Sequence, residues 1–353
     1  MSTADVFITA DSLIAFSEAL LNATRVSPDK SRLVAVSLVA ANLRGVDSHG
    51  VQLLPYYLEQ LESGDMDANE DGCVLSENGS CLHYNGQNGI GQAIAEICCR
   101  HAVRIASETG LSMVVARDSN HFGAAAFWAQ KMAGAGQIGI VMCNASALVA
   151  PWQGKEPRLG TNPICMAVPG GEEQPWLLDM ATTTVAAGKI FKAMINGKAE
   201  IPAGWAMDSE GVATTDTQTA LQGLLMPLGG YKGSGLAMMA EILCAVLSGG
   251  AMSTDLGGIR FRGKPVQISQ MFLAIDVARF LPVNEFRARM DRLIGMMKST
   301  APASGFSEVL MAGEPEWRME QERRRSGIPV GHGTWKAMCE AADRLGVAAP
   351  SVP

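Results

Sequence analysis

The first 64 residues carry apolar side chains every three or four positions, which is the spacing of one buried face of an α-helix. Thr9 or Asp11 can cap a first helix, because a short polar side chain accepts a hydrogen bond from the free amides of the first turn. Ser27-Pro28 is typical of a second helix start, and Gly64 ends a third helix. This region is therefore predicted to be helical.

From about residue 70 the pattern changes to short apolar runs between glycine, asparagine and proline, which is typical of β-strands. Helices interrupt the runs at about 92–109 and 122–133, and further apolar helices are predicted at about 233–248 and from 283 onward. Many connections are too short for the crossover that parallel strands need, so antiparallel or mixed pairing is predicted. The clearest strands are predicted at 111–116, 138–143, 164–168, 176–180 and 271–275.

Composition narrows the class of protein. A chain of 353 residues is too long for one ordinary core, so two or three packed units are expected. The net charge of −7 argues against nucleic-acid binding, which needs a basic surface. The N-terminus does not resemble a secretory signal, and the longest apolar segment, 236–247, is too short to cross a membrane. Eight cysteines without a C-x-x-C pair indicate reduced thiols and a cytoplasmic protein.

Two histidines lie in turns beside glycine, where a side chain that exchanges protons near neutral pH can face a ligand. His49 lies in Arg44-Gly45-Val46-Asp47-Ser48-His49-Gly50, at a break between two predicted helices. His121 lies in Ser119-Asn120-His121-Phe122-Gly123, where a strand ends and a helix begins. The partial positive charge of a helix start would keep His121 neutral and able to accept a proton. Each histidine taken alone also fits a structural role.

Several loops contain small polar residues or glycines that expose backbone groups to a ligand, at 158–163, 178–183 and 227–235. In the second of these, Asp179 could bind a cofactor hydroxyl, orient a histidine, or serve only as a cap. In the third, the glycines, the helix start and Lys232 suit a phosphate or carboxylate, although a flexible entry loop also fits the pattern.

One glycine motif is misleading. The run Gly134-Ala135-Gly136-Gln137-Ile138-Gly139 matches G-x-G-x-x-G, the pattern of a dinucleotide-binding loop. It follows a predicted helix and precedes a predicted strand, which is the reverse of the order that such a loop requires. We interpret it as a helix stop, so no Rossmann signature remains.

Six segments, taken in order, resemble the malate/L-lactate dehydrogenase-like family, which includes sulfolactate and ureidoglycolate dehydrogenases, diketogulonate reductase and Δ1-piperideine-2-carboxylate reductases. The similarity extends from the first helix to about residue 330. Each segment is short, but six of them in family order are hard to attribute to chance. The segments are 44–50, 120–123, 160–163, 179–182, 201–205 and 227–233.

The resemblance implies an α/β fold of the α+β type. It implies a non-Rossmann NAD(P)-binding domain on a mostly antiparallel or mixed sheet, and a helical domain formed by both ends of the chain. The expected boundaries are 1–75 with 283–353 for the helical domain and 76–282 for the sheet domain. A homodimer is expected, with the active site between the domains and near the subunit interface.

The resemblance also implies roles for individual residues. His49 is the expected proton donor to the carbonyl or imine, and His121 is the alternative or cooperating acid-base residue, with Ser48 and Asp179 beside them. The expected substrate contacts are Arg44, Gln52, Tyr57, Arg158 and Thr161. The expected contacts to NAD or NADP are Asn144, Ser146, Gly160, Asn162, Asp179, Met180, Ala181, Thr182, Lys232, Gly233, Gly313 and Glu314.

One position departs from the family pattern. Relatives often carry an arginine four residues after the Ser-His-Gly histidine, where its planar fork can hold a substrate carboxylate. This chain has Leu53 there. Arg44 or Arg158 could substitute, or the substrate differs.

The predicted reaction is reversible hydride transfer between the nicotinamide of NAD or NADP and a 2-oxo acid, a 2-hydroxy acid or a cyclic imino acid. One alternative is a non-catalytic protein that binds a nicotinamide nucleotide, which Leu53 would favour. A second is a metal-dependent hydrolase that uses His49, His121 and Asp179, although these residues lack the usual ligand spacing and no metal is predicted. The expected partner is a small molecule rather than nucleic acid or membrane.

Overall fold

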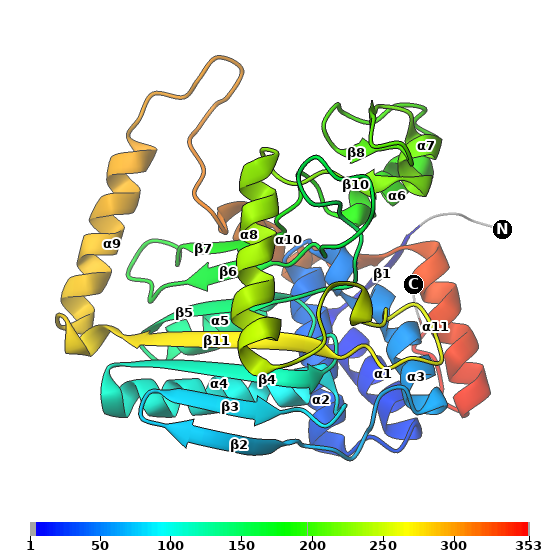
Figure 1. The fold of residues 1–353 in the computed structure, drawn as a ribbon, viewed down its shortest axis with the longest axis horizontal. Coiled ribbons are helices and arrows are strands. Elements are labelled where there is room, and N and C mark those ends of the chain that lie inside the picture. The colour runs from blue at the N-terminus through cyan, green and yellow to red at the C-terminus, as the bar shows by residue number, and fades with distance from the viewer. Residues whose placement is uncertain (1–4, 196, 352–353) are drawn as a thin grey trace.

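The centre of the protein is a seven-stranded sheet with the order β2-β3-β4-β11-β5-β6-β7 (Figure 1). A computed structural model describes residues 5–195 and 197–351. Within these residues β3 and β4 are the one parallel pair of this sheet, so the predicted mixed sheet is confirmed. The strands are β2 (Cys73–Asn78), β3 (Cys81–Asn85), β4 (Leu111–Ser119), β5 (Gln137–Cys143), β6 (Ile164–Ala167), β7 (Leu177–Met180) and β11 (Ile268–Asp276).

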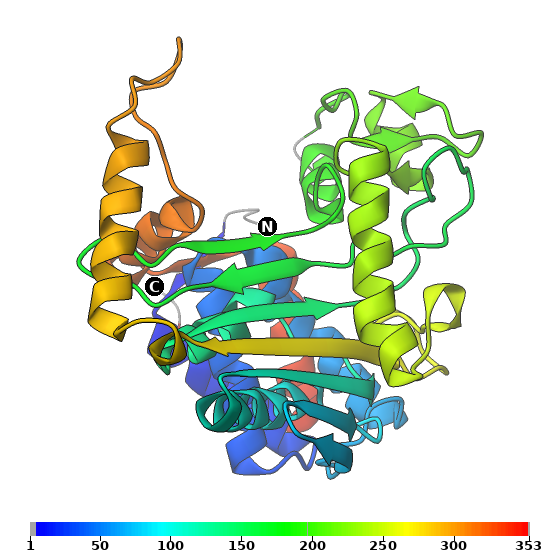
Figure 2. The ribbon, with the colours of Figure 1, turned by 60° about the vertical axis from the view of Figure 1, so that its left-hand side comes forward.

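One face of the sheet is covered by α4 (Gly91–Thr109) and α5 (Ala125–Gly134) (Figure 2). Strand side chains alternate between the two faces, and Val114, Val141 and Phe272, which are register partners, point to this side and are fully buried. They pack with apolar residues of both helices in the largest core of the protein. Burial of this face fixes α4 and α5 against the sheet. The loop that contains His121 lies between β4 and α5.

The opposite face of the sheet is covered less completely. Helix α8 (Tyr231–Glu241) continues into the π-helical turn η3 (Ile242–Val246) and crosses the strands in front of the sheet (Figure 1). Cys244 of η3 packs on Val115, Met142 and Met271. Helix α9 (Val283–Lys298) stands to one side of the sheet and contributes one buried residue, Ile294.

The two ends of the chain meet in a second core. Strand β1 (Val6–Ile8) pairs with β12 (Ile328–Val330), and α11 (His332–Leu345) packs against the N-terminal helices. Helix α10 (Glu314–Ser326) lies against α2. Helix α9 contributes no buried residue to this core in the described part of the chain, although the expected domain boundary at residue 283 includes it. The N-terminal helices are α1 (Ala10–Ala23), α2 (Pro28–Leu43) and α3 (Leu54–Ser63), with the short turns η1 (Asp47–His49) and η2 (Val51–Leu53) between the last two.

A small lobe lies above the sheet in Figure 1 and has its own apolar core, which includes Ile190 and Leu225. Its three-stranded sheet has the order β10-β8-β9. The elements are α6 (Ala187–Ile195), β8 (Ala206–Met207), β9 (Ala213–Thr214), α7 (Thr217–Gln222) and β10 (Leu224–Leu225); the turns η4 (Ser253–Asp255) and η5 (Val277–Arg279) flank β11.

Two helix starts differ from the sequence expectation. Helix α5 begins at Ala125 rather than 122, because Gly123 has a left-handed φ of +78° and residues 120–124 form a loop. Helix α8 begins at Tyr231, so Lys232 lies in its first turn. None of the helices in the described residues combines the length and the apolar character needed to cross a membrane.

Candidate active site

His49 is held at the turn between α2 and α3. Gly45 adopts a φ of +76° and ends α2, and Asn42 then bridges the turn. The Asn42 amide donates to Asp47 at 2.6 Å, and its oxygen accepts from the Val51 amide at 2.8 Å. Arg323 of α10 donates to the Asp47 carboxylate at 2.6 and 3.0 Å. These contacts fix the backbone on both sides of His49.

His121 lies in the loop between β4 and α5, and the structure brings it to His49. Their ring centroids are 5.6 Å apart and the ring planes differ by 24°. The Asn120 amide donates to the Gly89 carbonyl at 2.9 Å, which anchors the loop to the start of α4. Gly91 allows the close approach, because a Cβ built there would lie 2.2 Å from the His121 carbonyl oxygen. The two histidines are thus neighbours although 72 positions separate them in the chain.

A chain of hydrogen bonds behind His121 assigns its tautomer. The Gln92 amide donates to the Tyr57 oxygen at 3.1 Å, and the Tyr57 hydroxyl lies 2.6 Å from His121 Nδ1. Burial raises the pKa of Tyr57 well above its usual range, so the hydroxyl keeps its proton and donates it to Nδ1. The Gly123 amide also donates to Nδ1, at 3.3 Å. Nδ1 is therefore an acceptor, and the proton of the neutral ring lies on Nε2.

Both imidazoles are held in the neutral form. Burial, together with the neighbouring His49 and Arg260, lowers the pKa of His121 to about 3. Burial and Arg260 also lower the pKa of His49. Each histidine residue nevertheless keeps some accessible surface. The predicted neutrality of His121 thus has a different cause from a helix start, since α5 begins four residues later.

Neither Nε2 atom of the pair has a hydrogen-bond partner within residues 5–195 and 197–351. The Nδ1 of His49 is 3.0 Å from the Ser48 hydroxyl, so Ser48 fixes this ring as Tyr57 fixes the other. The site therefore presents two neutral rings, each oriented through Nδ1 and open at Nε2. Such a pair can donate one hydrogen bond and exchange one proton with a ligand.

Arg260, which the sequence analysis did not identify, adds a positive charge to this site. Its guanidinium lies 5.6 Å from the Tyr56 ring centroid and 5.9 Å from that of Phe191. The local sequence Gly257-Gly258-Ile259-Arg260-Phe261 matches no motif. The one available signal was a basic residue beside paired glycines, which by itself indicates only a loop.

Asp179 does not contact either histidine. Its carboxylate accepts from the Ala126 amide at 2.9 Å and caps the start of α5. Asp179 has accessible surface, but the surrounding protein removes much of its hydration and raises its pKa to about 6, against the opposing effects of the Ala126 amide and Arg44. The cap role, one of the alternatives for this residue, is the one that the contacts support.

Asn144 and Asn162, expected to bind the cofactor, are fully buried and share one acceptor, the carboxylate of Glu241. The Asn144 amide donates to Glu241 at 3.2 Å, and that of Asn162 donates to the same carboxylate at 3.3 Å. Their oxygens accept from the Ser269 and Ala145 amides, at 2.8 and 2.9 Å. Two further donations, to the Ala251 and Ala237 carbonyls, use the remaining protons. These side chains are left with little capacity for a cofactor.

Three of the predicted cofactor loops converge. The Thr161 carbonyl accepts from the Thr182 amide at 2.9 Å, and the Thr182 carbonyl accepts from the Leu228 amide at 2.9 Å. Gly233 packs in this junction, where a Cβ would lie 2.6 Å from the Thr182 oxygen. Gly160, Met180 and Ala181 adjoin it in the chain. Ser146 lies at the other side of the Asn162 loop and donates to the Gly257 carbonyl at 2.6 Å.

The residues at this junction fit a dinucleotide phosphate. Lys232 is exposed and lies in the first turn of α8, whose start has no side-chain cap among the described residues. Free amides and an ammonium group at a helix start attract an anion. Among residues 5–195 and 197–351, no three His, Cys, Asp or Glu side chains are grouped so that they could hold a metal ion.

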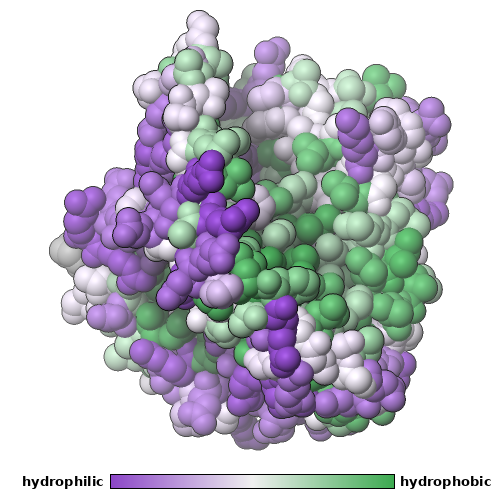
Figure 3. All heavy atoms as spheres, turned by 90° about the vertical axis from the view of Figure 1, so that its left-hand side faces the viewer, coloured by the Kyte–Doolittle hydropathy of each residue, from purple (hydrophilic) through white to green (hydrophobic). Residues whose placement is uncertain are grey.

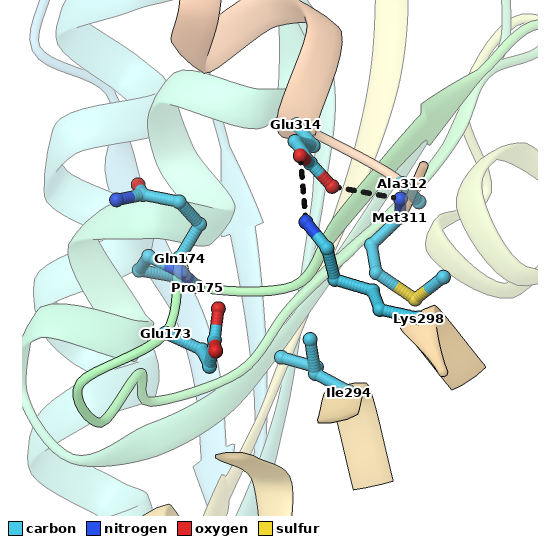
Figure 4. Close-up of a pocket in the computed structure, with 8 residues that line it drawn as sticks. All are labelled: Glu173, Gln174, Pro175, Ile294, Lys298, Met311, Ala312 and Glu314. Carbon is cyan, nitrogen blue, oxygen red and sulfur yellow. Dashed lines mark hydrogen bonds and ion pairs between the residues drawn. The ribbon is translucent and has the colours of Figure 1, made fainter. Parts of the chain in front are cut away.

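Gly313 packs against β7, where a Cβ built on it would lie 2.9 Å from the Leu177 carbonyl oxygen, and Glu314 follows at the start of α10 (Figure 4). The Leu177 amide donates to the Ala312 carbonyl at 3.2 Å. The Glu314 carboxylate accepts from Lys298 of α9 at 2.8 Å and from the Met311 amide at 3.2 Å, as the dashed lines in Figure 4 mark. Together with Arg318 at 2.6 Å, these contacts saturate Glu314 and tie α9 to α10.

The predicted substrate contacts differ in their surroundings. Tyr57 is buried behind His121 and acts on its ring rather than on a ligand. Gln52 is half-buried beside His49 in sequence, but no described contact joins it to either ring. Arg44 is paired with Glu320 at 3.7 Å, and Arg158 contacts Glu156 and the Pro157 carbonyl in its own surface loop.

Comparisons with known proteins show what the whole chain is similar to. Residues 8–339 match the family described as malate/L-lactate dehydrogenase. The chain is 36% identical to the malate dehydrogenase of Pyrococcus horikoshii, over 96% of this chain and 95% of that protein. It is 33% identical to the L-sulfolactate dehydrogenase of Methanocaldococcus jannaschii, over 91% and 92% of the two chains. The solved structure of the Pyrococcus horikoshii malate dehydrogenase matches with a TM-score of 0.90 and 34% identity, covering 99% of each chain.

Proposed function

The chain belongs to the malate/L-lactate dehydrogenase family, and from this premise we propose that it transfers a hydride between NAD or NADP and a small 2-oxo or 2-hydroxy acid or a cyclic imino acid. The observation that carries the proposal is the pair of stacked, neutral imidazoles whose Nε2 atoms are open to a ligand. A protein that only binds the nucleotide would not need such an acid-base pair.

The cofactor would be held by the junction of residues 160–162, 180–182 and 227–233, with Lys232 and the first-turn amides of α8 at its phosphates. The bound nicotinamide supplies or accepts the hydride. This assignment places cofactor binding on a mostly antiparallel sheet outside the Rossmann class. The misleading G-x-G-x-x-G motif at Gly134–Gly139 fits that interpretation, since α5 ends at Gly134 and β5 begins at Gln137.

The two histidines have different roles in the proposed reaction. His121 donates a hydrogen bond from Nε2 to the substrate oxygen, because Tyr57 and the Gly123 amide keep its Nδ1 in the accepting role. His49 exchanges the proton: the neutral ring accepts it when a hydroxy acid is oxidised, and the protonated ring returns it in reduction. Because the pKa of His49 is lowered, its neutral form prevails above pH 6.5. Activity in the oxidation direction should fall as the pH drops below that value.

The test is a spectrophotometric panel that follows NADH and NADPH oxidation with pyruvate, oxaloacetate, longer 2-oxo acids and cyclic imines. We expect turnover with at least one of these compounds. Tight NAD(P)H binding with no turnover across the panel would favour the binding protein. A nicotinamide absorbance change that a chelator does not affect would exclude the hydrolase.

We also propose a homodimer. Helix α8 and η3 expose Tyr231, Met238, Ile242 and Val246, at successive steps of seven, four and four residues along one face. Figure 3 shows hydrophobic side chains gathered in a broad area on this side of the molecule. Large exposed apolar areas commonly mark subunit contacts. Sedimentation equilibrium tests the assignment.

The remaining proposals concern location and domains. The eight cysteines are free thiols, and five are buried, which suits the reducing cytoplasm. We divide the chain at 1–75 with 283–353 and at 76–282, with the separate terminal and sheet cores in support. Limited proteolysis followed by mass spectrometry would map the boundaries. It would show in particular to which domain α9 belongs.

A further inference from the structure

We propose that Arg260 binds the substrate carboxylate beside the two imidazoles, so that the enzyme acts on acids whose carboxylate is attached to the reacting carbon. This inference rests on the oxidoreductase function proposed above. Its first support is position. Arg260 lies between the Tyr56 ring of α3 and the Phe191 ring of α6, at 5.6 and 5.9 Å from their centroids.

Both flanking elements border the histidines. Tyr57, next to Tyr56 on α3, lies 2.6 Å from His121 Nδ1. The start of α6 approaches Ser48, whose hydroxyl lies 3.0 Å from the Nδ1 of the His49 ring, since a Cβ built on Gly188 would lie 3.5 Å from the Ser48 Cβ. The guanidinium thus lies between the two helices that border the pair of rings. Its positive charge lowers the pKa of both histidines.

The loop that carries Arg260 is anchored on either side of it. Gln60 of α3 is fully buried, and its amide donates to the Ile259 carbonyl at 3.3 Å and to the Phe261 carbonyl at 2.6 Å. The Gly263 amide donates to Asp65 at 2.8 Å. Figure 1 shows the loop, coloured yellow, passing in front of the N-terminal helices. A fixed backbone spares a ligand the cost of ordering the arginine.

Arg260 also has the binding capacity that a carboxylate needs. Within residues 5–195 and 197–351 it has no carboxylate within 4 Å, whereas Arg44 is paired with Glu320 and Arg323 with Asp47. Aromatic rings against the face of a guanidinium leave its N–H edge available for a two-pronged bond to a carboxylate. Leu53 and Gln52, next to the His49 turn, supply no positive charge.

The same loop provides a matched control. Arg262 lies two residues further on and is paired with Glu59. The experiment compares Arg260→Leu, Arg260→Lys and Arg262→Leu in the full-length enzyme. It measures kcat and KM for the best 2-oxo acid of the panel and for the primary amide of that acid, and NAD(P)H affinity by fluorescence.

Arg260→Leu should lower kcat/KM for the acid about 100-fold, mainly through KM, because the carboxylate loses its charged partner. Activity with the amide and NAD(P)H affinity should change less than about twofold, as should all values for Arg262→Leu. Arg260→Lys, which keeps charge but not the fork, should lose roughly 10-fold and remains informative if the leucine variant does not fold.

An unchanged preference for acid over amide in Arg260→Leu, or in Arg260→Lys if only that variant folds, would overturn this assignment while leaving the proposed function intact. A wild-type enzyme that binds NAD(P)H but neither reduces nor binds any carboxylate of the panel would overturn the function and the Arg260 assignment together. The wild-type measurements therefore separate the two failures.

Discussion

The histidine pair and the asparagine network lie in the same protein and were predicted from the same kind of loop, yet they differ in how their polar atoms are used. At His49 and His121, one nitrogen of each ring is fixed by protein and the other is open. At Asn144 and Asn162, both amide protons and the oxygen are bonded within the protein. The open atoms mark a site for chemistry, and the satisfied atoms mark a structural joint.

The largest expected effect concerns the open region. His49→Ala should lower kcat by about 10² to 10⁴, the usual contribution of a positioned acid-base group, while NAD(P)H affinity stays nearly unchanged. Steady-state kinetics and fluorescence titration measure the two quantities. His332→Ala, at the exposed start of α11, is the control and should keep full activity. Unchanged turnover in His49→Ala would remove that residue from the proposed role.

The next effect concerns the satisfied region. Asn162→Ala should destabilise the protein by about 2 to 4 kcal/mol, because it leaves the Ala145 amide without its acceptor and removes one donor each from Glu241 and the Ala237 carbonyl. Urea unfolding measures the loss. Asn162→Gly is a useful second variant, since Asn162 has a φ of +32° that alanine tolerates poorly. A variant that stays stable but loses NAD(P)H affinity would break the comparison and return Asn162 to the cofactor site.

Local signals explain which parts of the fold were predictable. The proline after Ser27 starts α2 and Gly64 ends α3, as expected, because caps and turns depend on a few adjacent residues. The reversed glycine motif was interpreted correctly, since α5 ends at Gly134 and β5 begins at Gln137. The histidine segments were found because their residue types and neighbours suffice to suggest chemistry.

What could not be predicted depends on partners far away in the chain. The role of Asn162 depends on Glu241, 79 positions away, and the position of Arg260 depends on the buried side chain of Gln60. For Asp179 the sequence left three roles open, namely cofactor binding, orienting a histidine and capping; the contact that favours the cap is with the Ala126 amide, at the start of a helix that the sequence placed three residues early. A polar residue in a loop thus identifies a candidate, and tertiary contacts decide whether any of its atoms remain open.

A smaller effect sharpens the assignment of His121. Tyr57→Phe removes the donor to Nδ1, so we expect roughly a 10-fold loss of kcat, the value of about one hydrogen bond. The pKa of His121 should rise from about 3, because the hydroxyl no longer favours the neutral ring. Nitrogen NMR of labelled histidine reports both the tautomer and the pKa. Tyr84→Phe is the control, since that buried hydroxyl bonds the Asp71 carbonyl away from the site. An unaltered Nε2–H signal in Tyr57→Phe would show that Tyr57 does not set the tautomer.

The smallest expected effect concerns the pH dependence of stability. It compares two aspartates that cap helices and whose pKa values are shifted in opposite directions. Asp179 caps α5 and is partly open to solvent, but the surrounding protein removes much of its hydration and raises its pKa to about 6, whereas hydrogen bonds from Thr219 lower the pKa of Asp216, the cap of α7. Asp179 therefore contributes stability that is present below pH 3.8 and is lost as the pH rises through about 6. Asp216 contributes stability that is present above pH 3.8 and is lost as the pH falls through its lowered pKa.

The two Asp→Asn variants should consequently show pH dependences of opposite sign. From pH 4 to pH 7, the stability of Asp179→Asn relative to wild type should rise, by less than about 1 kcal/mol because solvent reaches this carboxylate. Asp216→Asn should instead lose the most relative to wild type at neutral pH and recover near pH 3. Urea unfolding of both variants at pH 3, 4, 5.5 and 7 measures this. Equal slopes would mean that Asp179 is hydrated like Asp216, and its cap would then no longer differ electrostatically from an ordinary surface cap.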